Sequence, residues 1–101
     1  MSLPYRFHPL AQQELEAAVN LLESERPTTG LELATAVETA IEHVSQFPES
    51  APITRGHVRA KLVLPASQWP YTVFYRVKAD HIRVLAIGHQ RRHPFYWLGR
   101  Q

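Results

Sequence analysis

The apolar residues change their spacing halfway along the chain, and this change restricts the possible folds more than any other feature. Between residues 9 and 47 they recur every three or four positions, as on one side of an amphipathic helix. Between residues 57 and 88 they alternate with other residues, as in strands that bury one side. We therefore expect a chain that forms helices first and a sheet afterwards.

Two helices are expected in the first half, over residues 9–26 and 28–47. Pro9 begins the first helix, where the N–H that proline lacks would have no partner within the helix, and Pro27 ends it. One of the two threonines that follow is expected to cap the second helix, and Gly30 to allow the tight bend between them. Because the connection is short, the two helices are predicted to form a hairpin.

Strands are expected at residues 5–8, 57–64, 71–78 and 81–88. The last three follow one another through hairpin connections and predict an antiparallel meander, while the first strand is expected to pair at an edge or beside the last one. Residues 1–101 are predicted to form a single domain of the α+β class. In this two-layer fold an N-terminal strand precedes a helical hairpin, which packs on an antiparallel sheet that ends in the three-stranded meander.

The composition excludes several classes of site. The chain has no cysteine, so disulfide scaffolds, thiolate metal sites and a cysteine nucleophile are ruled out. No stretch approaches the roughly 18 apolar residues of a membrane span, and no signal region opens the chain, so we expect a cytoplasmic protein without membrane contact. His89 and His93 have the spacing of a metal pair, but Pro94 interrupts any helix there and no acidic residue is near in sequence. No metal and no other cofactor is expected.

The charges are divided unequally between the two halves of the chain. Residues 1–50 hold eight acidic and two basic residues, whereas residues 51–101 hold nine basic residues and one acidic residue. Two explanations are open. The second half binds an anionic partner, either a nucleic acid or an acidic protein, or the two halves neutralise each other across the fold. We favour the anionic partner, because nine cations against one anion exceed what a solvated surface needs.

The segment after the last expected strand, residues 88–100, combines three arginines, two histidines and three aromatic residues. Arginine recognises phosphate and carboxylate groups through two parallel hydrogen bonds. For Arg91 and Arg92 we therefore favour a binding role. For Phe95, Tyr96 and Trp97 we favour packing against the sheet, because aromatic side chains lie more often in a core than at a contact.

Four segments, in order and over nearly the full length, resemble the RelE/ParE superfamily of toxins from type II toxin–antitoxin systems. They are Phe7-His8-Pro9-Leu10-Ala11 with Glu14-Leu15, the stretch from Gly30-Leu31-Glu32-Leu33 to Phe47-Pro48, Pro70-Tyr71-Thr72-Val73-Phe74-Tyr75, and the stretch from Ile82-Arg83-Val84 to Phe95-Tyr96-Trp97. The resemblance implies the fold derived above, with two helices against a small antiparallel sheet.

The superfamily includes two mechanisms. RelE-like members cut messenger RNA in the decoding site of the ribosome, whereas ParE-like members poison DNA gyrase and are not nucleases. In both groups a cognate antitoxin with a partly disordered segment holds the toxin inactive. The closing Arg-Arg-x-Pro-x-Tyr-Trp pattern is most similar to the ParE-like group of plasmid stabilisation proteins.

The resemblance thus implies a ParE-like toxin that inhibits gyrase and is neutralised by an acidic antitoxin. A homodimer and a hetero-oligomer with the antitoxin are both open. We expect the contacts to antitoxin or target to come from cations gathered in one exposed patch, with Arg59, Lys61 and Arg76 on the side of the sheet away from the helices. The residues assigned to these contacts are Arg59, Lys61, Arg76, Arg91, Arg92, Trp97 and Arg100.

Three alternatives remain open: a RelE-like nuclease acting on ribosome-bound mRNA, a non-catalytic nucleic-acid-binding module, and a decayed member without toxicity. A nuclease needs an acid, a base and cations around the reacting phosphate. Thr72 and Gln90 stand where RelE-like nucleases carry arginines, which favours the ParE-like interpretation. If the chain is a nuclease, the catalytic residues are expected to be Lys61, His89, Arg91 and Tyr96.

Overall fold

The computed structural model describes residues 2–101 and contains two helices and five strands. In chain order they are β1 (Tyr5–Phe7), α1 (Pro9–Glu25), α2 (Thr29–Gln46), β2 (Ile53–Arg55), β3 (Val58–Leu62), β4 (Tyr71–Val77) and β5 (Ile82–His89). This order confirms the predicted α+β fold. The short strand β2 is an addition, because it lies in a segment for which the alternation of residues predicted no strand.

The five strands form one sheet in the order β1-β5-β4-β3-β2. Strands β2 to β5 pair antiparallel, and β3, β4 and β5 form the predicted meander. At the edge, β1 pairs beside β5 as expected, and it does so in the parallel direction, which makes the sheet mixed. A parallel pair needs a long crossover, and the whole helical hairpin and the other strands lie between β1 and β5 in the chain.

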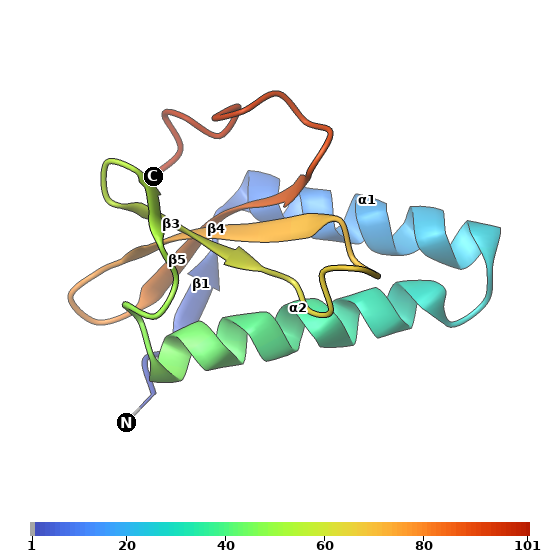
Figure 1. Cartoon of the computed structure of the whole chain (residues 1–101), viewed down its shortest axis with the longest axis horizontal. Helices are drawn as coiled ribbons and strands as arrows, with labels where there is room; N and C mark the ends of the chain where they lie inside the picture. Colours follow the sequence, from blue (N-terminus) through green and yellow to red (C-terminus); the bar gives the residue numbers. More distant parts are fainter. Residues whose placement is uncertain (1) are drawn as a thin grey trace.

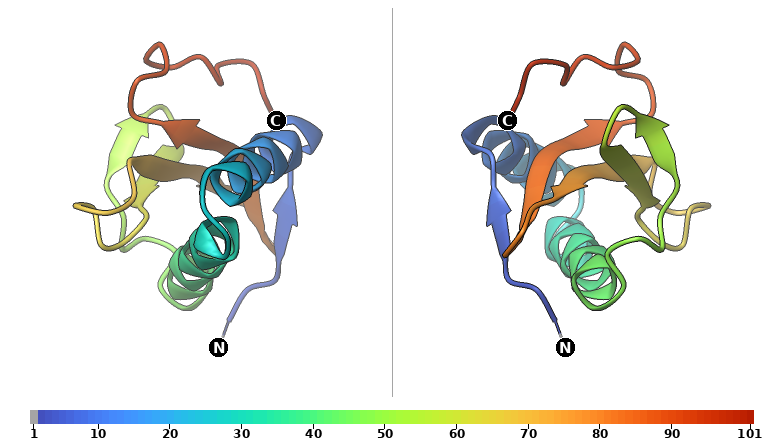
Figure 2. Two further views of the ribbon diagram at one scale, coloured as in Figure 1. Left: turned by 90° about the vertical axis from the view of Figure 1, so that its right-hand side faces the viewer. Right: turned by 90° about the vertical axis from the view of Figure 1, so that its left-hand side faces the viewer.

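The sheet has a layer on each side (Figures 1 and 2). The helices cover one side, where Leu33, Ile41 and Tyr75 belong to the first hydrophobic core. Residues 90–101, which we call the tail, arch over the other side and close a second, smaller core. That core holds Val58, Leu85, Ala86 and Trp97, with Phe74 and Tyr96 packed against it. Packing of Tyr96 and Trp97 against the sheet, as favoured from the sequence, is therefore confirmed.

The turn between the helices differs in detail from the prediction. Thr28 is the N-cap of α2 in a left-handed conformation, but its side chain makes no capping hydrogen bond. The Glu23 carboxylate caps α2 instead, accepting the backbone N–H groups of Thr28 at 3.1 Å and Leu31 at 3.0 Å. Gly30 allows the close approach of the two helices and does not form a bend, because a Cβ at this position would clash with the Val19 carbonyl oxygen.

Neither helix within residues 2–101 is long and apolar enough to cross a membrane. The tail is the element that positions the candidate site, because it connects the end of β5 with α1 across the sheet.

Candidate functional site: the Glu14 clasp and the pocket beside it

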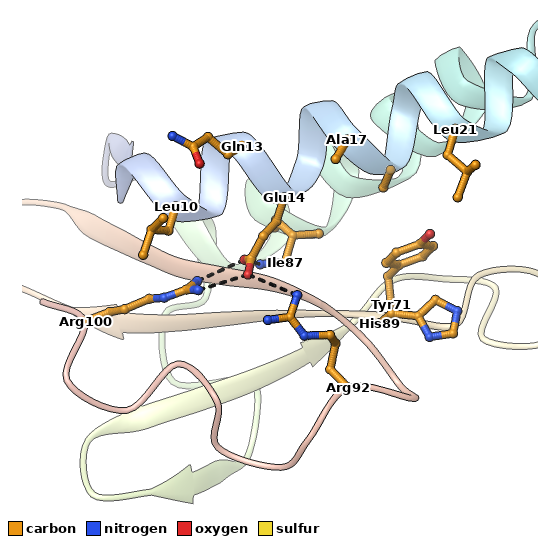
Figure 3. Close-up of a pocket in the computed structure, with 11 residues that line it drawn as sticks. Leu10, Gln13, Glu14, Ala17, Leu21, Tyr71, Ile87, His89, Arg92 and Arg100 are labelled. Carbon is orange, nitrogen blue, oxygen red and sulfur yellow. Dashed lines mark hydrogen bonds and ion pairs between the residues drawn. The ribbon is translucent and has the colours of Figure 1, made fainter.

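One carboxylate on α1 holds the tail in place. Glu14 Oε1 accepts the backbone N–H of Ile87 on β5 at 3.0 Å and Nη1 of Arg100 at 3.0 Å. Its Oε2 accepts Nη2 of Arg100 at 3.0 Å, and Nη1 of Arg92 lies 3.9 Å away (Figure 3). We call Glu14, Arg92, Tyr96 and Arg100 the Glu14 clasp. It joins α1, β5 and both ends of the tail at one point.

The central pair of the clasp is shielded from water. The side chains of Glu14 and Arg100 are 13% and 12% exposed, and Arg100 donates a further hydrogen bond to the Leu85 carbonyl at 3.0 Å. Two parallel hydrogen bonds between a guanidinium and a carboxylate are among the strongest polar contacts in proteins. The pair therefore fixes the tail, and its two charges satisfy each other.

Tyr96 lies close to both arginines of the clasp. The guanidinium of Arg92 is 3.9 Å from the centre of its ring, and that of Arg100 is 5.1 Å away. The hydroxyl oxygen of Tyr96 is buried and has no hydrogen-bond partner of regular geometry within residues 2–101. Burial, reinforced by the nearby negative charge of Glu14, raises the pKa of Tyr96 to about 12.

This shift predicts a loss of stability at high pH. Between the ordinary tyrosine pKa of 10.0 and about 12, the unfolded chain releases a proton that the folded chain keeps. The free energy of unfolding therefore falls as the pH rises through this range. Urea titrations at several pH values are expected to show a steeper fall for the wild type than for Tyr96→Phe, which lacks the hydroxyl. Equal falls in both proteins would contradict the assignment.

A pocket of about 530 Å³ opens beside the clasp, between α1 and the end of β5 (Figure 3). Leu10 and Leu21 of α1 contribute exposed apolar surface. His89 faces them, with its ring edge-on to Tyr71 at 5.2 Å and its Nδ1 accepting the Arg91 N–H at 3.0 Å. The pocket thus combines an apolar wall on α1 with histidine and arginine groups on the opposite wall.

The comparisons with known proteins concern the family and the fold of the chain. Residues 5–94 match the model of a family described as ParE toxin of type II toxin-antitoxin system, parDE. The chain belongs to this family. Its fold is similar to a solved structure titled "Chromosomal ParDE TA system from P. aeruginosa", with a TM-score of 0.73 and 18% sequence identity. The similarity covers 87% of this chain and 96% of the other. None of the curated proteins compared with the chain matches it.

In this ParE toxin, the predicted cations do not gather in one patch. The prediction that Arg59 and Lys61 lie on the side away from the helices is wrong. Arg59 is opposite Tyr75 of the first core, and its Nη1 donates to the Ala51 carbonyl at 2.7 Å. Lys61 is opposite the buried Val73 and lines a groove against α2. Val58 and Ala60 of the same strand face the tail side instead.

The other residues predicted to make contacts do not lie together. Arg92 and Arg100 belong to the Glu14 clasp, where their charges meet a carboxylate. Trp97 is 2% exposed in the second core and has almost no surface for a partner while the tail is packed. Arg76 lies on the tail side of β4, as predicted, and Arg91 is exposed on the tail. The binding roles of these residues stay predictions.

The residues predicted for a nuclease are also separated. Lys61 faces α2, whereas Tyr96 lies on the opposite side of the sheet against the second core. His89 lines the pocket, and no group of three metal-binding side chains occurs in the part of the chain that the structure describes. No described site therefore brings together the four groups of the nuclease hypothesis.

Sequence reasoning missed Glu14, which organises the site. It is one of eight acidic residues in the first half, and nothing in its spacing separates it from the solvated glutamates of the helices. The available signal was the resemblance to the toxin superfamily, because Glu14 is one of the residues that carry it. The arginines at positions 6, 55 and 83 were not selected either, although they share one side of the sheet with Arg76.

Proposed function

We propose that this ParE toxin inhibits DNA gyrase, does not cut nucleic acid, and is neutralised by a cognate acidic antitoxin. The observation that carries the proposal is the family match over residues 5–94. The separation of Lys61 from Tyr96 by the sheet supports a non-enzymatic toxin over the RelE-like alternative. Cleavage of RNA needs its acid, base and cations around a single phosphate.

The surroundings of Tyr96 support the same conclusion. Its burial and its two arginine neighbours fit a structural role in the Glu14 clasp.

The pocket beside the clasp is the proposed place for the antitoxin. Its apolar wall on α1 suits the apolar face of an amphipathic segment, and His89 and Arg92 on the opposite wall suit acidic side chains. Opposite charges on the two partners would speed association and make it sensitive to salt. Leu21 is the most suitable residue for a test of this proposal, because its side chain is 57% exposed and lines the pocket.

Leu21→Asp is expected to weaken antitoxin binding at least tenfold. The substitution places a negative charge on the apolar wall, where it removes a contact and repels acidic groups of the partner. The control is Leu31→Asp on α2, a substitution at a residue that is 63% exposed and lies outside this pocket. Titration calorimetry with the purified antitoxin measures both. Equal affinities of the two variants for the antitoxin would contradict its binding in this pocket.

The target is tested by inducing the chain in bacteria with and without its cognate antitoxin. We expect growth arrest only without the antitoxin, and inhibition of supercoiling when the purified toxin is added to gyrase. Primer extension on ribosome-bound mRNA is expected to show no new cuts. Cuts that disappear in Arg91→Ala and Tyr96→Phe would establish the nuclease, and harmless growth on induction would indicate a member without toxicity.

A further inference from the structure

Four arginines lie on one side of the sheet, three of them on adjacent strands, and we call them the arginine row. Arg6 of β1 is in register with Arg83 of β5, and Arg83 is in register with Arg76 of β4. Arg55 of β2 is opposite Val58 of β3, on the same side of the sheet. The row therefore includes an arginine from every strand except β3.

The arginine row lies on the side of the sheet away from the helices. Phe7, Tyr75 and Val84 are sequence neighbours of row members, and all three belong to or pack against the first core below the sheet. Because successive side chains in a strand point to opposite faces, their arginine neighbours point to the tail side. Val58 confirms this side at the β2 end, because it belongs to the second core under the tail.

No side-chain carboxylate forms an ion pair with the arginine row within residues 2–101. Arg83 donates to the carbonyl oxygen of Phe7 at 3.2 Å and to the backbone oxygen of Gln101, the last residue of the sequence, at 3.1 Å. Asp80 is close enough to Arg6 to interact electrostatically, but its carboxylate is hydrogen-bonded to His81 at 2.7 Å.

Such an arrangement is unfavourable for the isolated protein. Neighbouring strands are about 4.8 Å apart, and like charges directly opposite each other destabilise a sheet. The arginine row places two such pairs in succession, from Arg6 to Arg83 and from Arg83 to Arg76. An anionic ligand that bridges these guanidinium groups would remove the repulsion.

We propose that the arginine row binds the phosphodiester backbone of a nucleic acid, independently of base sequence. All four cations are arginines, whose planar guanidinium groups match phosphate oxygens in pairs. The only apolar residue in line with them, Val58, is buried. An interface with an acidic protein normally has an apolar centre, whereas nucleic-acid interfaces are more polar and strongly positive.

An aromatic ring at the β2 end of the row favours the same ligand. The guanidinium of Arg55 is 5.1 Å from the centre of the Phe95 ring, and Phe95 remains 36% exposed. Its backbone has a φ of 61°, in the left-handed region that bulky residues rarely adopt. An exposed ring next to a cation is the arrangement on which unpaired bases stack in proteins that bind single strands.

The test measures binding of fluorescein-labelled duplex DNA and single-stranded RNA to the full chain by anisotropy, without gyrase or antitoxin. Affinity is expected to fall linearly with salt on logarithmic axes. Arg6→Gln/Arg76→Gln is expected to weaken binding about tenfold or more at low salt. It should also reduce the slope by roughly 0.7 to 0.9 for each arginine removed. Arg6→Lys/Arg76→Lys keeps the charges and is expected to keep most of the slope.

The matched control is Arg26→Gln, compared with the single variant Arg6→Gln; it removes one positive charge at the helical hairpin, away from the row. It is expected to leave affinity and slope unchanged. The proposal is overturned if neither nucleic acid binds, if the control loses as much affinity as Arg6→Gln, or if polyglutamate competes as strongly as DNA. Because gyrase is absent, none of these outcomes depends on the proposed target of the toxin.

Discussion

Glu14→Leu is expected to lower the free energy of unfolding by about 3–5 kcal/mol, because it leaves the Arg100 guanidinium buried without its carboxylate. The variant also removes the acceptor of the Ile87 N–H and the negative charge that lies 3.9 Å from Nη1 of Arg92. Urea unfolding followed by circular dichroism gives the free energy directly. The tail is expected to detach in the variant, which exposes Trp97 and shifts its fluorescence.

A double-mutant cycle separates the clasp from the packing around it. Glu14→Leu/Arg100→Leu removes both buried charges, and we expect it to be more stable than Glu14→Leu alone. Arg92→Gln is the milder control, because its side chain is 53% exposed and its nitrogen lies 3.9 Å from the carboxylate. A double variant as unstable as the sum of the two single variants would show that the pair does not act as a unit.

Trp97→Ala is expected to cost about 3–5 kcal/mol, the usual range for removing a large aromatic side chain from a core. The indole is 2% exposed and packs 5.1 Å from the Phe74 ring, between centres. Its loss leaves a cavity against Leu85 and Ala86. The adjacent Leu98→Ala is the control, because Leu98 is exposed and its truncation is expected to change stability by about 0.5 kcal/mol or less.

Thermal and urea unfolding of both variants measure the difference. A Trp97→Ala protein as stable as Leu98→Ala would mean that the second core contributes nothing to folding. The loss in Trp97→Ala is expected without any change at Glu14, so the two predictions test the two anchors of the tail separately.

The helices and the meander could be predicted because each element buries one side. Apolar residues therefore recur in the sequence with a regular spacing. Strand β2 left no such signal, since Ile53–Arg55 has three exposed residues between Pro52 and Gly56. The direction of β1 was not predictable either. Its parallel pairing with β5 depends on the path that the chain takes between the two strands, and no local sequence pattern indicates that path.

The site was predicted less well, for a physical reason visible in β3. Alternation shows which residues share a side of a strand, but not which side meets the helices. Both sides of β3 are covered, one by α2 and the other by the tail, so Arg59 and Lys61 were assigned to the wrong side of the sheet. The contact between Glu14 and Arg100 joins residues 86 positions apart, and nothing in either segment indicates the other.

That distance in the chain has a consequence for the order of folding. Closing a contact between residues 86 positions apart costs more chain entropy than forming the hairpins, so the contact is expected to form after the helices and the meander have come together. By the same reasoning, the tail amides are expected to open first and to exchange with solvent deuterium sooner than those of β4 and β5. The last step of folding would then be the one that completes the pocket wall.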